Sequence, residues 1–309
     1  MRPLAFLIAF LAFLTAFVHG QQTPTSPAQV GSQPVVDGAR INQHDIPVNH
    51  SDLYCAGFVS AKLLPRQHFV AGGLGTPIQS EFHDRDLIYL HGGGYEPGTR
   101  VSLVREMRDL NSYSPFPAAR NLLLRTGQMY AELGYARVLE IRGHDIAVAQ
   151  VEFACKNVAT GDLAVPFVAK PALSYRKRSS MDQFPATPSK VAGRIIAARE
   201  FDQYLASGSK IYINVGVQNG VKVGDYFRVV RGYEVQSLDS VDAAVFEQSF
   251  GEDTQKNPPR LPKKSLGELP KHVVGEAIVL GTTPGSATAM ITFAMEEIHV
   301  GDVIELETE

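Results

Sequence analysis

The sequence has no tryptophan, only two cysteines and no excess of basic residues among its 309 positions. Its formal net charge of −3 gives no basic field of the kind that binds nucleic acids or anionic membranes. Glycine and proline are numerous, at 27 and 19 residues, and they favour a turn-rich β protein over a helical bundle. We therefore expect no nucleic-acid partner.

Patterns that carry chemistry are also missing. The chain contains neither a G-x-x-x-x-G-K-[ST] phosphate loop nor a G-x-S-x-G nucleophile elbow. The stretch HGGGY, His91 to Tyr95, has the composition of a lipase oxyanion loop, but without the elbow it is better explained as a hairpin or bulge corner. HDRD, from His83, lacks the ligand spacing of a metal site. We predict no catalytic, cofactor-binding or metal-binding residue, and no cofactor.

The longest apolar run lies at the N-terminus, in MRPLAFLIAFLAFLTAFVHG. A basic Arg2, the apolar run, and Val18 and Gly20 at the −3 and −1 positions predict a cleaved signal peptide. A membrane anchor is the alternative, although the run is short for a span. Gln21 follows the expected cut, where a lipoprotein would have cysteine. We expect an exported protein, periplasmic or extracellular, without an integral membrane span after cleavage.

The two cysteines are Cys55 and Cys155. An even number of cysteines in an exported chain favours a disulfide, which here would close a loop of 100 residues (155 − 55). A nucleophilic cysteine is the alternative, but no partner histidine is fixed nearby.

Four blocks of sequence recur in the same order, which indicates an internal duplication. IYLHGGGYEPGTRVSLVRE, from Ile88, matches IYINVGVQNGVKVGDYFRVVR, from Ile211. The matched pairs are Gly57 with Gly193, Ile88 with Ile211, Gly98 with Gly224, Arg105 with Arg231, Phe153 with Phe293, and Gly161-Asp162 with Gly301-Asp302. Short alternating strands between tight turns then predict an all-β fold of two tandem, related, small antiparallel barrels or sandwiches.

The expected organisation follows from composition. We expect a signal peptide at 1–20, a disordered tether at 21–50, a first β domain at 51–168, a linker at 169–190 and a second β domain at 191–309. Each β domain also bears an insertion at the equivalent point, DLNSYSPFPAARNLLLRTGQMYAEL in the first and SFGEDTQKNPPRLPKKSLGELPKH in the second.

The glycine-rich stretch GVQNGVKVGD, residues 216–225, is predicted to be a structural corner. No helix follows it, and Asn219-Gly220 is a signal for a type I′ hairpin. Gly224-Asp225 precedes an apolar strand, as turn residues do, and Gly98, Gly161-Asp162 and Gly301-Asp302 are placed in the same class.

Tyr89 and Tyr212 repeat within matching strands. Their rings could form a platform for a glycan, and packing at the edge of the core is the alternative. The basic YRKR, Tyr175 to Arg178, could contact anionic polymers, or it could be solvated linker charge.

The segments KIYINVGVQNGVKVGDYFRVVR, VVGEAIVL and ATAMITFAMEEIHVGDVIEL together resemble the C-terminal domain of flagellar assembly protein T. They are also similar to β-barrel modules of exported bacterial proteins that carry a LysM peptidoglycan-binding motif elsewhere. The resemblance covers about residues 209–309, with a diverged echo in 55–165. It implies a small β-barrel used in envelope assembly or binding, and it carries no catalytic residues.

We therefore expect an exported, non-enzymatic cell-envelope protein that binds or scaffolds an envelope protein or peptidoglycan. A dedicated peptidoglycan- or glycan-binding module is the first alternative. A hydrolase that uses His91 or His144 is the second.

Overall fold

The structure is a computed structural model that describes residues 45–109, 117–184, 189–233 and 261–307. All of these residues belong to one compact unit, residues 41–309. The predicted signal peptide and residues 21–44 of the predicted tether lie outside the described residues, as do residues 234–260, which include 249–260 of the second insertion. No helix in the described part of the chain is long and apolar enough to cross a membrane.

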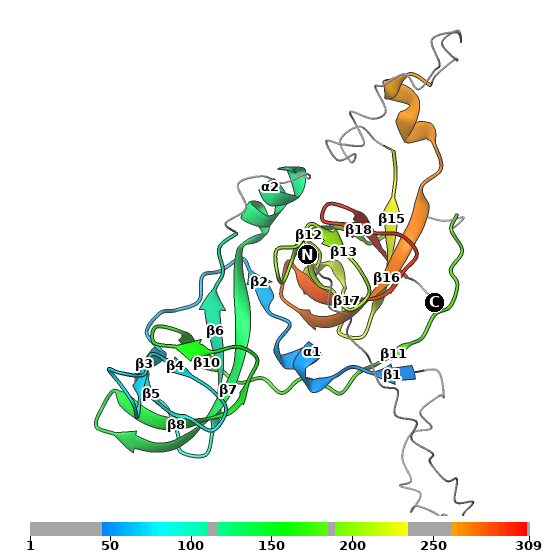
Figure 1. The fold of residues 1–309 in the computed structure, drawn as a ribbon. Helices are drawn as coiled ribbons and strands as arrows, with labels where there is room; N and C mark the ends of the chain where they lie inside the picture. Colours follow the sequence, from blue (N-terminus) through cyan, green and yellow to red (C-terminus); the bar gives the residue numbers. More distant parts are fainter. Residues whose placement is uncertain (1–44, 110–116, 185–188, 234–260, 308–309) are drawn as a thin grey trace, which may run out of the picture. The chain divides into compact units, whose positions relative to one another are not determined.

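The first barrel is a closed ring of six antiparallel strands (Figure 1). In ring order these are β3 (Phe69–Gly73), β5 (Leu87–His91), β8 (Ile146–Ala154), β7 (Gln128–Arg142), β6 (Arg100–Glu106) and β10 (Leu163–Pro166). The long β7 closes the ring by pairing with both β6 and β8, and its first residues also pair with β2 (Phe58–Ser60). Alternate residues such as Ile88 and Leu90 are fully buried and form the core.

The second barrel is also a closed ring of six strands (Figure 1). In ring order these are β12 (Ala192–Ala198), β14 (Lys210–Ile213), β17 (Ala287–Ala294), β16 (His272–Thr282), β15 (Tyr226–Arg231) and β19 (Val303–Leu306). Its core is filled by alternating β-branched and small residues, among them Ile211, Val279 and Ala289, all fully buried.

The two rings match strand for strand and register for register. Tyr89 of β5 pairs with Val148 of β8, and Tyr212 of β14 pairs with Thr288 of β17, at offsets of 123 and 140. Bulges also recur, since the register shifts after Val70 in β3 and after the corresponding Ile195 in β12. The predicted all-β fold of two tandem related antiparallel barrels is confirmed.

One predicted correspondence is wrong. Gly57 was matched with Gly193, but β12 corresponds to β3 and not to the segment that follows Cys55. The backbone decides this, because Val70 and Ile195 each exchange hydrogen bonds with a Gly-Asp turn, at residues 161–162 and 301–302 respectively. Several short apolar segments fit the same strand pattern, so local similarity selected the wrong one.

The Gly-Asp turns hold a repeated ion pair. Arg105 of β6 donates to both carboxylate oxygens of Asp162 at 2.6 and 2.8 Å, and Arg231 of β15 donates to both oxygens of Asp302 at 3.2 and 2.8 Å. Both carboxylates are buried, and each also accepts a backbone N–H from three residues earlier. The same arginine–aspartate clasp therefore closes each barrel. It links β6 to the turn between β9 (Val158–Ala159) and β10, and β15 to the turn between β18 (Ile298–His299) and β19.

The predicted turn glycines adopt left-handed backbone angles. Their φ values are 86° at Gly98, 94° at Gly161, 84° at Gly220, 92° at Gly224 and 105° at Gly301. Asp225 caps its turn by accepting the N–H of Lys222 at 2.8 Å.

The predicted type I′ hairpin at Asn219-Gly220 is wrong. That turn needs positive φ at both central residues, and Asn219 instead belongs to the 3-10 helix η1 (Val217–Asn219), which ends at left-handed Gly220. The Asn219 amide oxygen accepts the N–H of Gly216 at 3.1 Å, so this side chain stabilises a short helical turn and not a two-residue hairpin.

The predicted tether and linker are partly ordered, which corrects both assignments. The strand β1 (Asp45–Pro47) falls in the expected tether and pairs with β11 (Ser174–Arg176) in the expected linker. Helix α1 (His50–Tyr54) follows β1, and the first insertion holds α2 (Pro117–Thr126). The remaining elements are the two-stranded pairs β4 (Glu81–Phe82) with β9 (Val158–Ala159) and β13 (Tyr204–Leu205) with β18 (Ile298–His299), and η2 (Lys263–Glu268).

Candidate functional site: a cleft on the first barrel

A cleft of about 430 Å³ opens on the first barrel. Its walls are residues 93–96 of the glycine-rich loop, residues 99–101 at the start of β6, residues 164–167 at the end of β10, and His68. Three separate parts of the ring thus meet at one hollow, because β10 pairs with β6 and the loop lies between β5 and β6.

Tyr95 and His68 form one wall of the cleft. The Tyr95 hydroxyl donates to the His91 carbonyl at 3.1 Å, and burial raises the pKa of this phenol to about 12. The His68 ring packs edge-on against Tyr95, with centroids 5.4 Å apart, and the buried His68 Nδ1 has no hydrogen-bond partner in the described part of the chain. Tyr95 therefore remains a neutral ring and hydroxyl at physiological pH.

Arg100 lies at the boundary between the cleft and a group of aromatic rings. Its guanidinium carbon is 5.4 Å from the Tyr135 ring centre and 5.7 Å from that of Phe167, within the range of cation–π attraction. The two rings themselves are 5.1 Å apart. Arg100 Nε donates to Glu152 Oε2 at 2.5 Å, and the side chain is still 41% exposed.

Glu152 is shared by two arginines. Arg100 donates to one of its oxygens and Arg137 to the other. Partial burial disfavours the ionised carboxyl, but the hydrogen bonds from Arg137 and Arg100 outweigh it and lower the pKa of Glu152. The hydrogen bond with Glu152 in turn raises the pKa of Arg100. Arg100 and Arg137 thus share the carboxylate of Glu152, and the cleft beside them also has the carboxylate of Glu96 in its lining.

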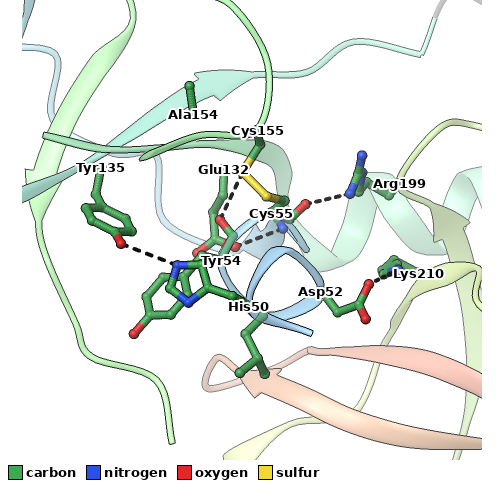
Figure 2. The surroundings of a disulfide bond; sticks show 12 residues. His50, Asp52, Tyr54, Cys55, Glu132, Tyr135, Ala154, Cys155, Arg199 and Lys210 are labelled. Atoms are coloured by element: carbon green, nitrogen blue, oxygen red, sulfur yellow. Dashed lines mark hydrogen bonds and ion pairs between the residues drawn. A yellow bond between two sulfur atoms is a disulfide. The ribbon is translucent and has the colours of Figure 1, made fainter. Parts of the chain in front are cut away.

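Helix α1 adds the rings of His50 and Tyr54 to this aromatic group. Tyr54 stacks on Phe167 with centroids 5.7 Å apart, and His50 packs edge-on to Phe153 at 4.8 Å. Figure 2 shows Tyr135 pointing at His50, where its Oη lies 3.3 Å from Nε2.

The disulfide fixes α1 to the first barrel. Cys55, at the end of α1, is bonded to Cys155, directly after β8, and the two Cα atoms are 5.7 Å apart (Figure 2). The predicted pairing is confirmed, and the alternative of a nucleophilic cysteine is wrong, since neither thiol is free.

The segment after the disulfide is held by second-barrel side chains. Four of its carbonyls accept hydrogen bonds from Arg199 (to Cys55, 2.9 Å), Tyr212 (to Ala56, 2.9 Å), Thr288 (to Gly57, 2.8 Å) and Ser286 (to Val59, 2.8 Å). Figure 2 shows the first of these contacts, together with the Lys210–Asp52 ion pair.

The predicted tyrosine platform is wrong for Tyr212. This ring is 1% exposed, its hydroxyl is used on a backbone carbonyl, and burial raises the pKa of the phenol. Tyr89 is half-buried on β5 and does not line the cleft. The packing alternative therefore describes Tyr212.

Neither histidine of the hydrolase alternative belongs to the lining of the cleft. His91 stacks on Phe69 with centroids 4.8 Å apart, and His144 is exposed beyond β7. Among the residues that the structure describes, neither histidine contacts both a carboxylate and a hydroxyl.

No protein-family model matches the sequence, and no curated protein matches it either. The resemblance to flagellar assembly protein T stays a prediction.

The basic YRKR segment does not form a free charged patch. Arg176 and Arg178 both pair with Glu276, at 3.1 and 2.6 Å, and both also contact Glu307. The Arg176 guanidinium lies 4.3 Å from the Tyr226 ring centre. Two of the three basic side chains thus serve to attach β11 to the second barrel.

Sequence reasoning identified part of the cleft but not its centre. HGGGY contributes Gly93, Gly94 and Tyr95 to the lining. The sequence patterns did not indicate Arg100 and Phe167 as site residues. These two residues meet only because β10 pairs with β6. A usable signal was the repeat itself, since the counterpart of Arg100, at an offset of 126, is the aromatic Tyr226.

Proposed function

We propose that this chain is an exported, non-enzymatic protein of the cell envelope that binds or scaffolds another component through the first-barrel cleft. The observation that carries the proposal is the cleft itself, where an exposed Arg100 lies beside the rings of Tyr135 and Phe167. Concave sites with aromatic walls and a few polar groups are the usual form of a binding site. Export is supported by the N-terminal pattern and by the disulfide, since disulfides persist mainly in oxidising compartments.

The neutral phenol of Tyr95 and the cation of Arg100 suit the cleft to binding a ligand. Tyr95 has a pKa of about 12, so it offers no base at neutral pH. Arg100 is a permanent cation, suited to holding an anion.

Site-specific crosslinking in intact cells tests this proposal. A photo-crosslinking residue at Glu96, which lines the cleft, should give a discrete crosslinked product that weakens when Arg100→Gln is added. The same residue at the exposed Lys222, on the second barrel, is the matched control. Absence of a product at Glu96, or identical products at both positions, would contradict a binding role for the cleft.

Glycan binding is a second candidate, because the rings of Tyr95 and Phe167 both border the cleft. Co-sedimentation of residues 21–309 with peptidoglycan sacculi tests it. Saturable pelleting should fall with Tyr95→Ala and with Phe167→Ala. It should persist with Tyr204→Ala, a tyrosine 45% exposed on the second barrel. Equal pelleting of all three variants would contradict a glycan site in the cleft.

A further inference from the structure

The second barrel has a counterpart of the Arg100 site, and the strand registers identify it. Arg100 pairs with Arg137 across β6 and β7, as Tyr226 pairs with Ile278 across β15 and β16. By the same registers, Tyr135 corresponds to Glu276. The residue after β10, Phe167, corresponds to Glu307, which follows β19.

In the second barrel this place is occupied by an extended peptide, the strand β11. The backbone N–H of Arg176 donates to the Tyr226 hydroxyl at 3.0 Å, and the Arg176 guanidinium covers the Tyr226 ring. Arg176 and Arg178 then neutralise Glu276, which is completely buried, and Glu307. The site on the second barrel thus consists of one aromatic ring and two carboxylates, and it binds the two arginines of β11.

The first barrel has the opposite charge at the same place. Two carboxylates of the site are replaced by the rings of Tyr135 and Phe167, and the positions of Tyr226 and Ile278 are taken by Arg100 and Arg137. Among the described residues, Arg100 has a hydrogen-bond acceptor only for its Nε, on Glu152. Its terminal nitrogens are available to a ligand.

Part of this place is already filled by the chain. His50 of α1 contacts the ring of Tyr135 (Figure 2), and Tyr54 of α1 stacks on the ring of Phe167. Arg100 nevertheless stays 41% exposed, and the cleft of about 430 Å³ opens next to it. The uncovered part therefore combines the Arg100 cation, the rings of Tyr95 and Phe167, the carboxylate of Glu96 and a hollow large enough for a side chain.

We infer that the first-barrel cleft binds an extended acidic peptide segment of a partner protein, in the way that the second barrel binds β11. A carboxylate of the partner pairs with Arg100, and a neighbouring side chain enters the cleft beside Tyr95. The inference rests on the proposed function, and it specifies an acidic peptide as the partner that the first-barrel cleft binds. A peptide is favoured over a sugar because the equivalent place in the same chain holds a peptide. An acidic one is favoured because the cationic Arg100, whose terminal nitrogens have no acceptor among the described residues, stands at the position that Tyr226 has in the second barrel.

The chain supplies its own probe. A fluorescent peptide of residues 171–180, PALSYRKRSS, carrying Arg176→Glu and Arg178→Glu, has the backbone of β11 and the reversed charge. It should bind the mature protein, residues 21–309. The unchanged peptide should bind at least about tenfold more weakly, because its arginines face Arg100. Binding is followed to about 1 mM peptide, the limit of weak specific association.

Two protein variants make the result specific. Arg100→Gln should weaken the charge-reversed peptide about tenfold or more. Arg66→Gln, which alters another exposed arginine that pairs with a glutamate on the same barrel, should leave binding unchanged. Circular dichroism confirms that both variants are folded.

Three outcomes overturn the inference. They are equal binding of both peptides, no binding up to the highest concentration, and binding that Arg100→Gln leaves unchanged. If the peptides fail while sacculi pellet in a Tyr95-dependent manner, the cleft is a glycan site. If the peptides fail but the Glu96 crosslink persists, the proposed function stands without this partner class. If neither the peptides bind nor the Glu96 crosslink forms, both the proposed function of the cleft and the inferred peptide partner are contradicted.

Discussion

The repeated arginine–aspartate clasp should stabilise each barrel separately. Asp162 and Asp302 are buried, and each accepts two hydrogen bonds from its arginine and one from a backbone N–H. Asp162→Asn and Asp302→Asn keep the shape of the side chain but remove its charge. One arginine N–H then loses its acceptor, because the asparagine amide nitrogen is itself a donor.

The size of the loss follows from the exposure of each arginine. A hydrogen bond to a charged group contributes about 1.5–3 kcal/mol when it is shielded from solvent. Arg105 is 40% exposed and Arg231 is 19% exposed, so water screens the first pair more. We expect about 2 kcal/mol for Asp162→Asn and about 3 kcal/mol for Asp302→Asn. Glu296, 3.7 Å from Arg231 and 44% exposed, is too distant and too solvated to replace Asp302.

Hydrogen exchange followed by mass spectrometry measures each barrel on its own, which suits a chain without tryptophan fluorescence. Asp162→Asn should speed exchange about 30-fold in β6 and β10, and Asp302→Asn about 150-fold in β15 and β19. Acceleration below about threefold in the mutated barrel would refute the stabilising role. Equal acceleration in both barrels would show that they open together, and it would refute their independence.

Three further substitutions follow from the geometry of the site and its neighbours. Replacing Cys55 and Cys155 by serine should lower the free energy of unfolding by about 4–5 kcal/mol, because the 100-residue loop is no longer closed. Urea titration measures this, and a loss below about 1 kcal/mol would contradict it. Tyr212→Phe should cost about 1–2 kcal/mol by leaving a buried carbonyl unpaired, whereas the half-buried Tyr89→Phe should stay within about 0.5 kcal/mol. Equal effects in thermal unfolding would argue against this difference. The pKa of Glu152 is lower in the folded chain than its ordinary value of about 4.3, so its stabilisation is complete above that value and is lost as pH falls through the lowered one. The stability advantage of the wild type over Glu152→Gln should therefore shrink between pH 7 and pH 3, and a constant gap would count against the ion pair.

The fold could be predicted from the sequence because its signals are local and occur twice. Strand alternation and turn glycines identify β6 and β15, and the constant offset of 126 aligns them. The one wrong match, Gly57 with Gly193, arose where the strand is short and no turn motif adjoins it. The correct partners, Val70 and Ile195, are fixed by hydrogen bonds to turns more than ninety residues away, which no local pattern shows.

The candidate site was less predictable because its residues come from distant parts of the chain. His68 precedes β3, Arg100 begins β6 and Phe167 follows β10, and only the closed ring brings them together. Composition was misleading in one place. The basic YRKR has the composition of a solvated linker, yet its Arg176 and Arg178 pair with buried or half-buried glutamates.

The outward faces of the two barrels differ in a way that the core does not. Ile278 and Met290 are buried on the outside of the second barrel, where Val48, Leu53 and Ala56 cover them. Their counterparts on the first barrel are Arg137 and Gln150, which remain accessible.

A contiguous group of large apolar residues on the outside of a barrel is favoured where something covers it, since a large exposed apolar patch is unfavourable. The second copy is apolar because the chain's own N-terminal segment and β11 lie on it. The first copy retains charges where the chain leaves it open. The duplicated barrels thus share one scaffold, but the outer face of the second is buried under its own chain and part of the outer face of the first stays accessible to solvent. The copy that its own chain covers only in part is the one where we propose that a partner binds.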